Sequence, residues 1–353
     1  MSEEKLWHRV KPGGKTKEEF EKGEIIQDGR PATAEELAQT LGKVQRIKAN
    51  ELIAREKERG IREVPKTPEE IEFIGMVQMM IKEERERLGL TPGFYIELER
   101  TRLFHSKDWE LREGHNKDAY RGEYRILEGL AETKTRGPSD RFSPYAYFKT
   151  ASHELLHQAS HYEADPLGNQ MRHRLGYAYQ NGWGRGLNEG MTEEINLELL
   201  GQHEGILEER FHDKLSDGKT YKWWSENPSY HVFRKVVREV ARRTDEILYP
   251  DAAKSVTWDN LKRGYFAGDD KALEDIKKAL GTEALEMFLL LGNEQLFNTD
   301  ETIPEKTYWH IERVIERYLT ESMTPRERDK MYQEVMSLKN PASISMEENV
   351  DKK

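Results

Sequence analysis

The chain of 353 residues contains no cysteine. This absence excludes disulfide bonds, thiolate metal ligands and a cysteine nucleophile, so any metal ion must be held by histidine, aspartate or glutamate. The N-terminus MSEEKLWHRVKPGG also lacks the apolar segment of a secretion signal. Both absences lead us to expect a cytoplasmic protein.

Long apolar runs and excess positive charge are missing as well. No stretch approaches the roughly 18 consecutive apolar residues that a membrane-spanning helix needs. The formal net charge of −10 argues against a general phosphate-binding surface. We therefore expect neither a membrane nor a nucleic-acid partner.

The patterning predicts an α+β protein in which a small twisted sheet packs on one helix and an all-helical lobe follows. The clearest helix signal is TPEEIEFIGMVQMMIKEERERLGL, where Thr67, Pro68 and Glu70 form a capping box and Gly89 marks the end. We divide the chain into a flexible arm at 1–32, a helical region at 33–90, a mixed core at 91–200, a helical lobe at 201–338 and a loose tail at 339–353.

Aromatic and β-branched residues predict strands between positions 93 and 135. The segments FYIELERTRLF and WELREG have this composition, and GEYRILEGLAETKT follows them. The last segment is short and charged. We expect it to be an edge strand, with which an extended peptide could pair.

The segment ASHELLHQASHY lies in a helix expected from about residue 143 to residue 162. Its residues His153 and His157 are four apart, so both imidazoles lie on one face and can bind one ion. Glu154 lies beside the first ligand, where its carboxylate can act as a general base. An unselected His-Glu-x-x-His occurs by chance about once in thirty such chains, so a third ligand must be found.

Three residues are candidates for the third ligand. His161 lies about 12 Å along the helix axis from His153, too far for a shared ion. Glu163 follows His157 by six residues, as in metzincins, but Ser160 occupies the position where that arrangement needs a glycine. We prefer Glu189 in GLNEGMTEE, which opens a second helix. Four residues later Glu193 could accept a ring N–H from a ligand histidine.

HELLH followed by LNEGMTEE resembles the gluzincin metallopeptidases, in particular short bacterial and archaeal members whose second motif reads Asn-Glu-Gly followed by Thr-Glu. The likeness spans about residues 90 to 285 and is specific at the two motifs. It implies a zincin fold, one zinc ion bound by His153, His157 and Glu189, and Glu193 as the carboxylate that supports a ligand histidine. It also implies Glu154 as the general base and a substrate that lies along the predicted edge strand.

The resemblance leads us to expect a zinc-dependent endopeptidase that acts on a peptide or protein substrate. Such enzymes stabilise the oxyanion with a tyrosine or histidine. Tyr230 is favoured, and the alternatives are His231, Tyr177, Tyr179 and His173.

Two other functions stay open. The protein could be a helical interaction or regulatory protein whose metal site is structural or inactive. It could also be an aminopeptidase, in which Glu128 or Glu132 would bind the free amine of the substrate. We expect a cleft between the sheet with its helix and the helical lobe, which the N-terminal residues 1–60 could cover. Tyr265 and Phe266 are expected to pack between helices. The sequence does not define an oligomeric state.

Overall fold

The computed structural model describes residues 26–27, 30–31, 34–90, 98–112, 122–125, 128–134, 144–164, 173–179, 183–215, 230–293 and 305–338. Most of the predicted arm and all of the predicted tail lie outside these ranges. The same holds for the aromatic residues Tyr221, Trp223 and Trp224. Among the described helices, none is both long and apolar enough to cross a membrane.

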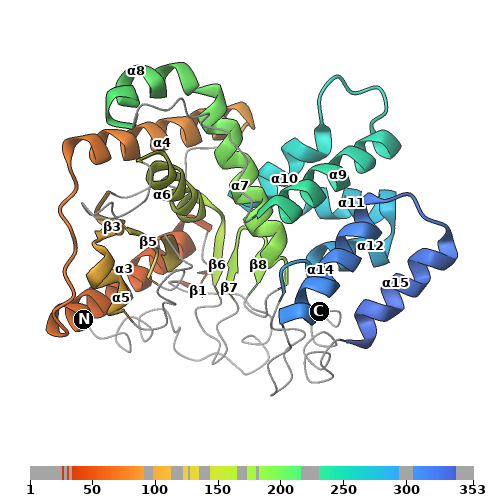
Figure 1. Ribbon diagram of the computed structural model, residues 1–353, viewed down its shortest axis with the longest axis horizontal. Coiled ribbons are helices and arrows are strands. Elements are labelled where there is room, and N and C mark those ends of the chain that lie inside the picture. The colour runs from red at the N-terminus through yellow and green to blue at the C-terminus, as the bar shows by residue number, and fades with distance from the viewer. Residues whose placement is uncertain are drawn as a thin grey trace.

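The described residues form an α+β fold that is mainly helical (Figure 1). The helices are α3 (Ala34–Glu58), α4 (Pro68–Arg87), α5 (Ser106–Glu110), α6 (Pro144–Ala159), α7 (Arg185–Gln202), α8 (Glu204–Leu215), α9 (His231–Leu248), α10 (Val256–Ala267), α11 (Lys271–Leu280), α12 (Thr282–Leu290), α14 (Glu305–Thr320) and α15 (Pro325–Ser337). The strands are β1 (Ile26–Gln27), β2 (Arg30–Pro31), β3 (Thr101–Phe104), β4 (Gly122–Arg125), β5 (Leu130–Lys134), β6 (Tyr162–Ala164), β7 (His173–Leu175) and β8 (Ala178–Tyr179).

A three-stranded mixed sheet has the order β3-β5-β4. Strand β3 runs parallel to β5, and β4 pairs with β5 antiparallel, with Gly122 opposite Thr133 and Tyr124 opposite Ala131. Alternate residues point to opposite faces of a sheet. Gly122, Tyr124 and Ala131 therefore share the face toward α6, whereas Arg102 and Glu132 lie on the other face.

Two strand predictions were wrong. The segment GEYRILEGLAETKT forms two strands instead of one, and only β4 lies at the edge while β5 is central. In WELREG, Trp109 and Glu110 belong to helix α5. The Trp109 side chain is fully buried beside Phe104 and Ile61, so tertiary packing outweighs the strand preference of this short segment.

Helix α3 covers the face of the sheet that points away from α6. Its Glu56 carboxylate lies 2.7 Å from Arg102 Nη1 and 2.8 Å from Arg112 Nε. Both arginines also bind Glu132, which accepts a third contact at 2.8 Å from Arg125 Nε. The last turn of α3 therefore lies behind the sheet, on the face away from the histidines.

Helix α4 begins as predicted. The side chain of Thr67 accepts a hydrogen bond from the backbone of Glu70, the Glu70 carboxylate accepts one from the backbone N–H of Thr67, and Pro68 is the first helical residue. Gly89 follows the helix with φ of 73°, a left-handed conformation that favours glycine. Met76 and Met80 on this helix are buried, whereas Ile71 points to solvent.

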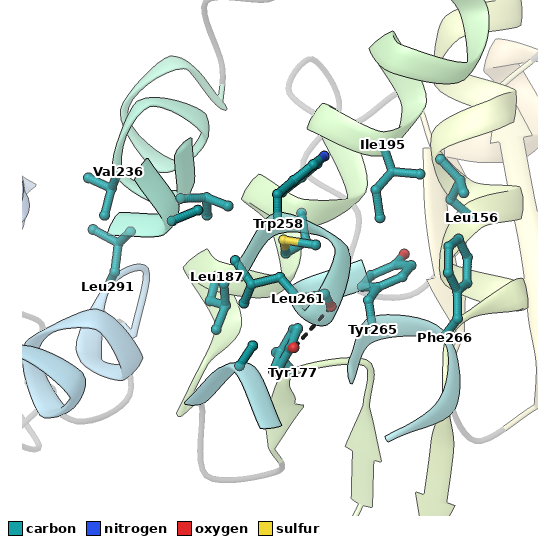
Figure 2. Packing of buried hydrophobic residues seen from close by; sticks show 14 of the residues in the cluster. Leu156, Tyr177, Leu187, Ile195, Val236, Trp258, Leu261, Tyr265, Phe266 and Leu291 are labelled. Atoms are coloured by element: carbon teal, nitrogen blue, oxygen red, sulfur yellow. Dashed lines mark hydrogen bonds between the residues drawn. The ribbon is translucent and has the colours of Figure 1, made fainter. Parts of the chain in front are cut away.

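One hydrophobic cluster joins α4, α6 and α7 to α9, α10, α12, α14 and α15, so it crosses the predicted boundary at residue 200. Helix α7 runs through the middle of the molecule, between the sheet with α6 and the later helices (Figure 1). Figure 2 shows Leu187 and Ile195 of α7 packed beside Leu261 and Tyr265 of α10. Tyr265 and Phe266 are buried between helices, as predicted.

Candidate metal centre

Helix α6 places His153 and His157 one turn apart, with both side chains buried. Their ring centroids lie 4.9 Å apart, and the rings are nearly perpendicular at 77°. The two Nε2 atoms are separated by 3.2 Å and converge on one point. The α6 helix ends at Ala159, earlier than the predicted end near residue 162.

Glu189 of α7 completes the group from the side opposite α6. Its carboxylate lies 3.3 Å from His153 Nε2 and 3.6 Å from His157 Nε2. A tetrahedral ion with bonds of about 2.0–2.1 Å holds its ligand atoms about 3.3–3.4 Å apart. The three residues form the one group of potential ligands in the described part of the chain whose atoms all lie within 4.8 Å of one another. The group therefore fits a small divalent ion.

Of the other two candidate ligands, His161 lies outside this group. His161 follows the end of α6, and its backbone N–H donates to the Tyr265 carbonyl at 2.8 Å. Its ring is turned toward Gly268, because a Cβ at that glycine would lie 2.6 Å from His161 Nε2. Glu163 belongs to β6, where its backbone pairs with Arg174, and its side chain lies outside the described part of the structure.

Glu193 supports His153 on the side away from the ligand group. Its Oε2 lies 3.0 Å from His153 Nδ1, and its Oε1 lies 2.9 Å from the Lys149 ammonium. Burial lowers the pKa of His153, but hydrogen bonds to Glu189 and Glu193 outweigh it and raise the pKa to about 10. Two buried carboxylates thus give this point a strong preference for positive charge.

The Nδ1 atom of His157 lies beside uncharged hydroxyl groups from α7 and α10. Thr192 Oγ1 lies 3.4 Å from His157 Nδ1, donates to the Asn188 carbonyl at 2.8 Å and lies 2.9 Å from the Tyr265 hydroxyl. With the threonine proton directed to Asn188, its lone pairs can accept from both the tyrosine and the imidazole. Nε2 of His157 then keeps its lone pair for an ion.

Sequence reasoning missed Lys149, Thr192 and the hydroxyl of Tyr265 as parts of this site. Lys149 precedes His153 by four residues, and Thr192 follows Glu189 by three. Both spacings place the residues on the same helix face as the ligand they accompany. That periodicity was a usable signal for these two residues, whereas Tyr265, which is more than 70 residues away in sequence, offered none.

The start of α7 is held by the end of α12. Backbone N–H groups of Gly184 and Gly186 donate to the carbonyls of Leu289 and Leu291 at 2.7 and 2.9 Å. A Cβ at Gly186 would lie 2.5 Å from the Leu291 carbonyl oxygen, so this close approach requires glycine. These contacts satisfy N–H groups that have no partner within a helix, and they fix the first turn ahead of Glu189.

Glu154 is buried and lies against the edge strand. A Cβ built on Gly122 of β4 would lie 2.6 Å from Glu154 Oε1. Burial raises the pKa of Glu154, and Glu189 raises it further against the opposing effect of His153, so that it reaches about 8. A carboxyl group with such a pKa can take up and release a proton near neutral pH. Tyr124 of the same strand stacks on His157 with centroids 6.3 Å apart.

Tyr230 lies beside the ligand group, at the position before the first turn of α9. Its ring stacks on His153 at an interplanar angle of 14° with centroids 5.3 Å apart. The negative charge of Glu189, together with burial, raises the pKa of the Tyr230 hydroxyl, which hydrogen-bonds to that carboxylate. The hydroxyl therefore stays protonated and remains a hydrogen-bond donor beside the ligand group.

Two of the alternatives to Tyr230 have described side chains, and neither lies in the same surroundings as Tyr230. His231 is exposed at the start of α9. Tyr177 is fully buried, and its hydroxyl donates to the Leu261 carbonyl at 3.0 Å (Figure 2). His173 and Tyr179 contribute backbone to the β6-β7-β8 sheet, and their side chains lie outside the described part.

The two carboxylates considered for binding a free amine differ in their environment. Glu132 is fully buried on the back of the sheet among Arg102, Arg112 and Arg125. Glu128 lies in the turn before β5, where burial raises the pKa of its carboxyl group. This geometry gives the aminopeptidase alternative no support.

Comparison of the chain with known protein families, curated proteins and solved structures found no match.

Proposed function

We propose that this chain is a zinc-dependent metallopeptidase of the gluzincin type, with a zincin-like core, that hydrolyses internal peptide bonds. The observation that carries the proposal is the convergence of His153 Nε2, His157 Nε2 and a Glu189 carboxylate oxygen, at separations of 3.2 to 3.6 Å. Two imidazoles and one carboxylate are the ligand set of catalytic zinc in several metallopeptidases, where the fourth position takes water or substrate.

Zinc, when bound by these three residues, would polarise a carbonyl and make water more acidic. Glu154 receives the proton of the attacking water while a bond forms between the water oxygen and the carbonyl carbon. The same carboxyl group then delivers the proton to the amide nitrogen as the C–N bond breaks. One water molecule is consumed, and a carboxylic acid and an amine are released.

Tyr230 would act on the carbonyl oxygen. Because the pKa of its hydroxyl is raised, it can donate a hydrogen bond when negative charge develops there. Its stacking on His153 keeps the ring within reach of the ligand group. Release of the contact with Glu189 would free the hydroxyl for substrate.

Strand β4 would hold the substrate. It lies at the edge of the sheet, and its Gly122 is directly beside Glu154. An extended peptide can add to a sheet edge through backbone hydrogen bonds. Such pairing with β4 would fix the position of the bond to be cleaved relative to α6. This mode of binding favours an unfolded or flexible protein segment as substrate.

The test combines zinc content with turnover of a fluorescence-quenched mixed peptide library for wild type, Glu154→Gln, Glu189→Ala and Glu163→Ala. We expect one zinc per chain and cleavage in wild type and Glu163→Ala. Glu154→Gln should keep zinc and lose cleavage, and Glu189→Ala should lose both.

Two outcomes would contradict the proposal. Full zinc in Glu189→Ala together with loss in Glu163→Ala would move the third ligand to Glu163. Full zinc in wild type without cleavage of any library peptide would instead favour an interaction or regulatory protein with a structural metal site.

A further inference from the structure

Helices α7 and α9 approach each other closely where α7 has a glycine. A Cβ built on Gly190 would lie 3.0 Å from the backbone carbon and oxygen of Phe233 and 3.0 Å from Val237 Cγ2. Phe233 belongs to the first turn of α9, three residues after Tyr230. The glycine that follows Glu189 therefore contacts the turn that carries the candidate oxyanion donor.

A charged clamp holds the same two helices one turn further along. The Glu194 carboxylate accepts from Arg234 Nε at 2.8 Å and from Arg238 Nε at 2.9 Å. Glu194 is mostly buried, and bonds between ionised groups are stronger than neutral ones. Gly190 sets how near the helices come, and Glu194 prevents α9 from sliding along α7.

The start of α9 carries this constraint to the metal centre. Tyr230 directly precedes the helix, and its ring lies nearly parallel to that of His153. Val237 continues the contact with α7, because its Cγ2 would lie 3.0 Å from a Cβ at Gly190, and Val236 and Val237 are both buried, so α9 packs tightly from its first turn onward. A displacement of this turn would move Tyr230 relative to His153.

We propose that Gly190 and Glu194 are positioning residues that place Tyr230 over His153 by fixing how α9 docks on α7. This inference rests on the proposed peptidase function, because the position of Tyr230 matters for the oxyanion. It assigns both residues a role in the activity that neither fulfils by touching metal or substrate.

The size of the perturbation follows from contact distances. Carbon atoms in contact lie about 3.5–4.0 Å apart, so the distance between an alanine Cβ at position 190 and these atoms must increase by about half an ångström or more. Two of the three atoms it meets are main-chain atoms of Phe233 within a helix, which cannot move alone, and the third is Val237 Cγ2. We therefore expect the first turn of α9, with Tyr230, to shift as a unit.

The first measurement needs no catalysis. A tyrosine ring stacked on His153 displaces the NMR signals of the imidazole protons upfield, which we would follow in the full-length chain labelled at histidine. Tyr230→Phe should keep the displacement and Tyr230→Leu should abolish it. Gly190→Ala and Glu194→Gln should lose most of it. The control is Gly75→Ala in α4, where a Cβ would meet nothing within 4 Å.

The second measurement is a double-mutant cycle in kcat with the peptide library. Tyr230→Phe should lower kcat by about 10²–10³-fold, as expected for loss of one oxyanion donor. Gly190→Ala should lower kcat by about tenfold, with zinc content and KM unchanged. In the Tyr230→Phe background, Gly190→Ala should have no further effect on kcat, because the hydroxyl that it would misplace is already absent.

Three results would overturn the inference: an unaltered His153 signal in both Gly190→Ala and Glu194→Gln, full additivity with Tyr230→Phe, or loss of zinc from Gly190→Ala. If Gly190→Ala does not fold, Glu194→Gln decides by the same two measurements. A wild type that binds zinc but cleaves no peptide would refute the peptidase function, and the NMR comparison would still decide the positioning of Tyr230.

Discussion

The contact between the edge strand and the general base leads to a sharp prediction for Gly122→Ala. The added Cβ would lie 2.6 Å from Glu154 Oε1, 2.7 Å from Glu154 Cγ and 2.8 Å from Thr150 Cγ2. Ordinary contacts of such atoms are about 3.5 Å or longer. One of the partners must therefore move by nearly an ångström.

The carboxylate of Glu154 is the group that moves most easily. Gly122 is held in the sheet through its pairing with Thr133, and Thr150 belongs to the same helix as Glu154. A misplacement of about 1 Å at a reacting centre can cost about 10²-fold in rate, which corresponds to about 2.7 kcal/mol in the activation barrier. The three atoms nearest the added Cβ belong to Glu154 and Thr150 and to neither histidine, so zinc affinity should not change.

The assay is kcat/KM for the best library peptide, measured with zinc content on the same preparation. We expect Gly122→Ala to fall by about 10²-fold at one zinc per chain. Gly75→Ala serves as the matched control, because its Cβ would meet nothing and alanine favours helix. Wild-type turnover in Gly122→Ala would refute the role of Glu154 as the base held beneath this strand.

Three further predictions concern metal affinity and stability. Thr192→Val removes the acceptor next to His157 Nδ1, so zinc should bind about 10–100-fold more weakly in a competition titration with a chromophoric chelator. Addition of zinc should raise the midpoint of thermal unfolding, and a chelator should reverse the change, because an ion bound only by the folded chain stabilises it. Equal midpoints would contradict the predicted site. Burial raises the pKa of Glu84, but hydrogen bonds from Arg87 and Lys262 outweigh it and lower the pKa, so its stabilisation is complete above its unfolded pKa of about 4.5 and is lost as pH falls through the lowered value. The free energy of unfolding, measured by urea titration, should accordingly decrease less between pH 6 and pH 3 for Glu84→Gln than for wild type. An equal decrease in both proteins would contradict this prediction.

Local sequence signals predicted the elements whose structure is determined locally. The capping box at Thr67 and Glu70 needs residues only three apart, and it sets the start of α4. The pair His153 and His157 likewise depends on one helical turn. The spacing of Glu189 and Glu193 on one face predicted one carboxylate among the ligands and the other beside a ligand histidine, and in the structure that histidine is His153.

Elements that depend on distant partners escaped prediction. The alternation in GEYRILEGLAETKT does not say that the chain reverses between β4 and β5 or that β3 pairs with β5. The wide separation of Thr192 and Tyr265 along the chain hides their hydrogen bond. Tyr230 came from a resemblance, and its stacking on His153 depends on how α9 packs against α7.

The hydrogen bonds that begin α7 affect the order in which the site can form during synthesis. The histidines at 153 and 157 leave the ribosome early, but the carbonyls of Leu289 and Leu291 follow more than 130 residues later. Until then the N–H groups at the start of α7 lack their protein acceptors, so the first turn of α7 is not fixed ahead of Glu189. A nascent chain that ends before Leu289 should therefore contain both histidines without retaining zinc, so that acquisition of the ion awaits synthesis of the end of α12.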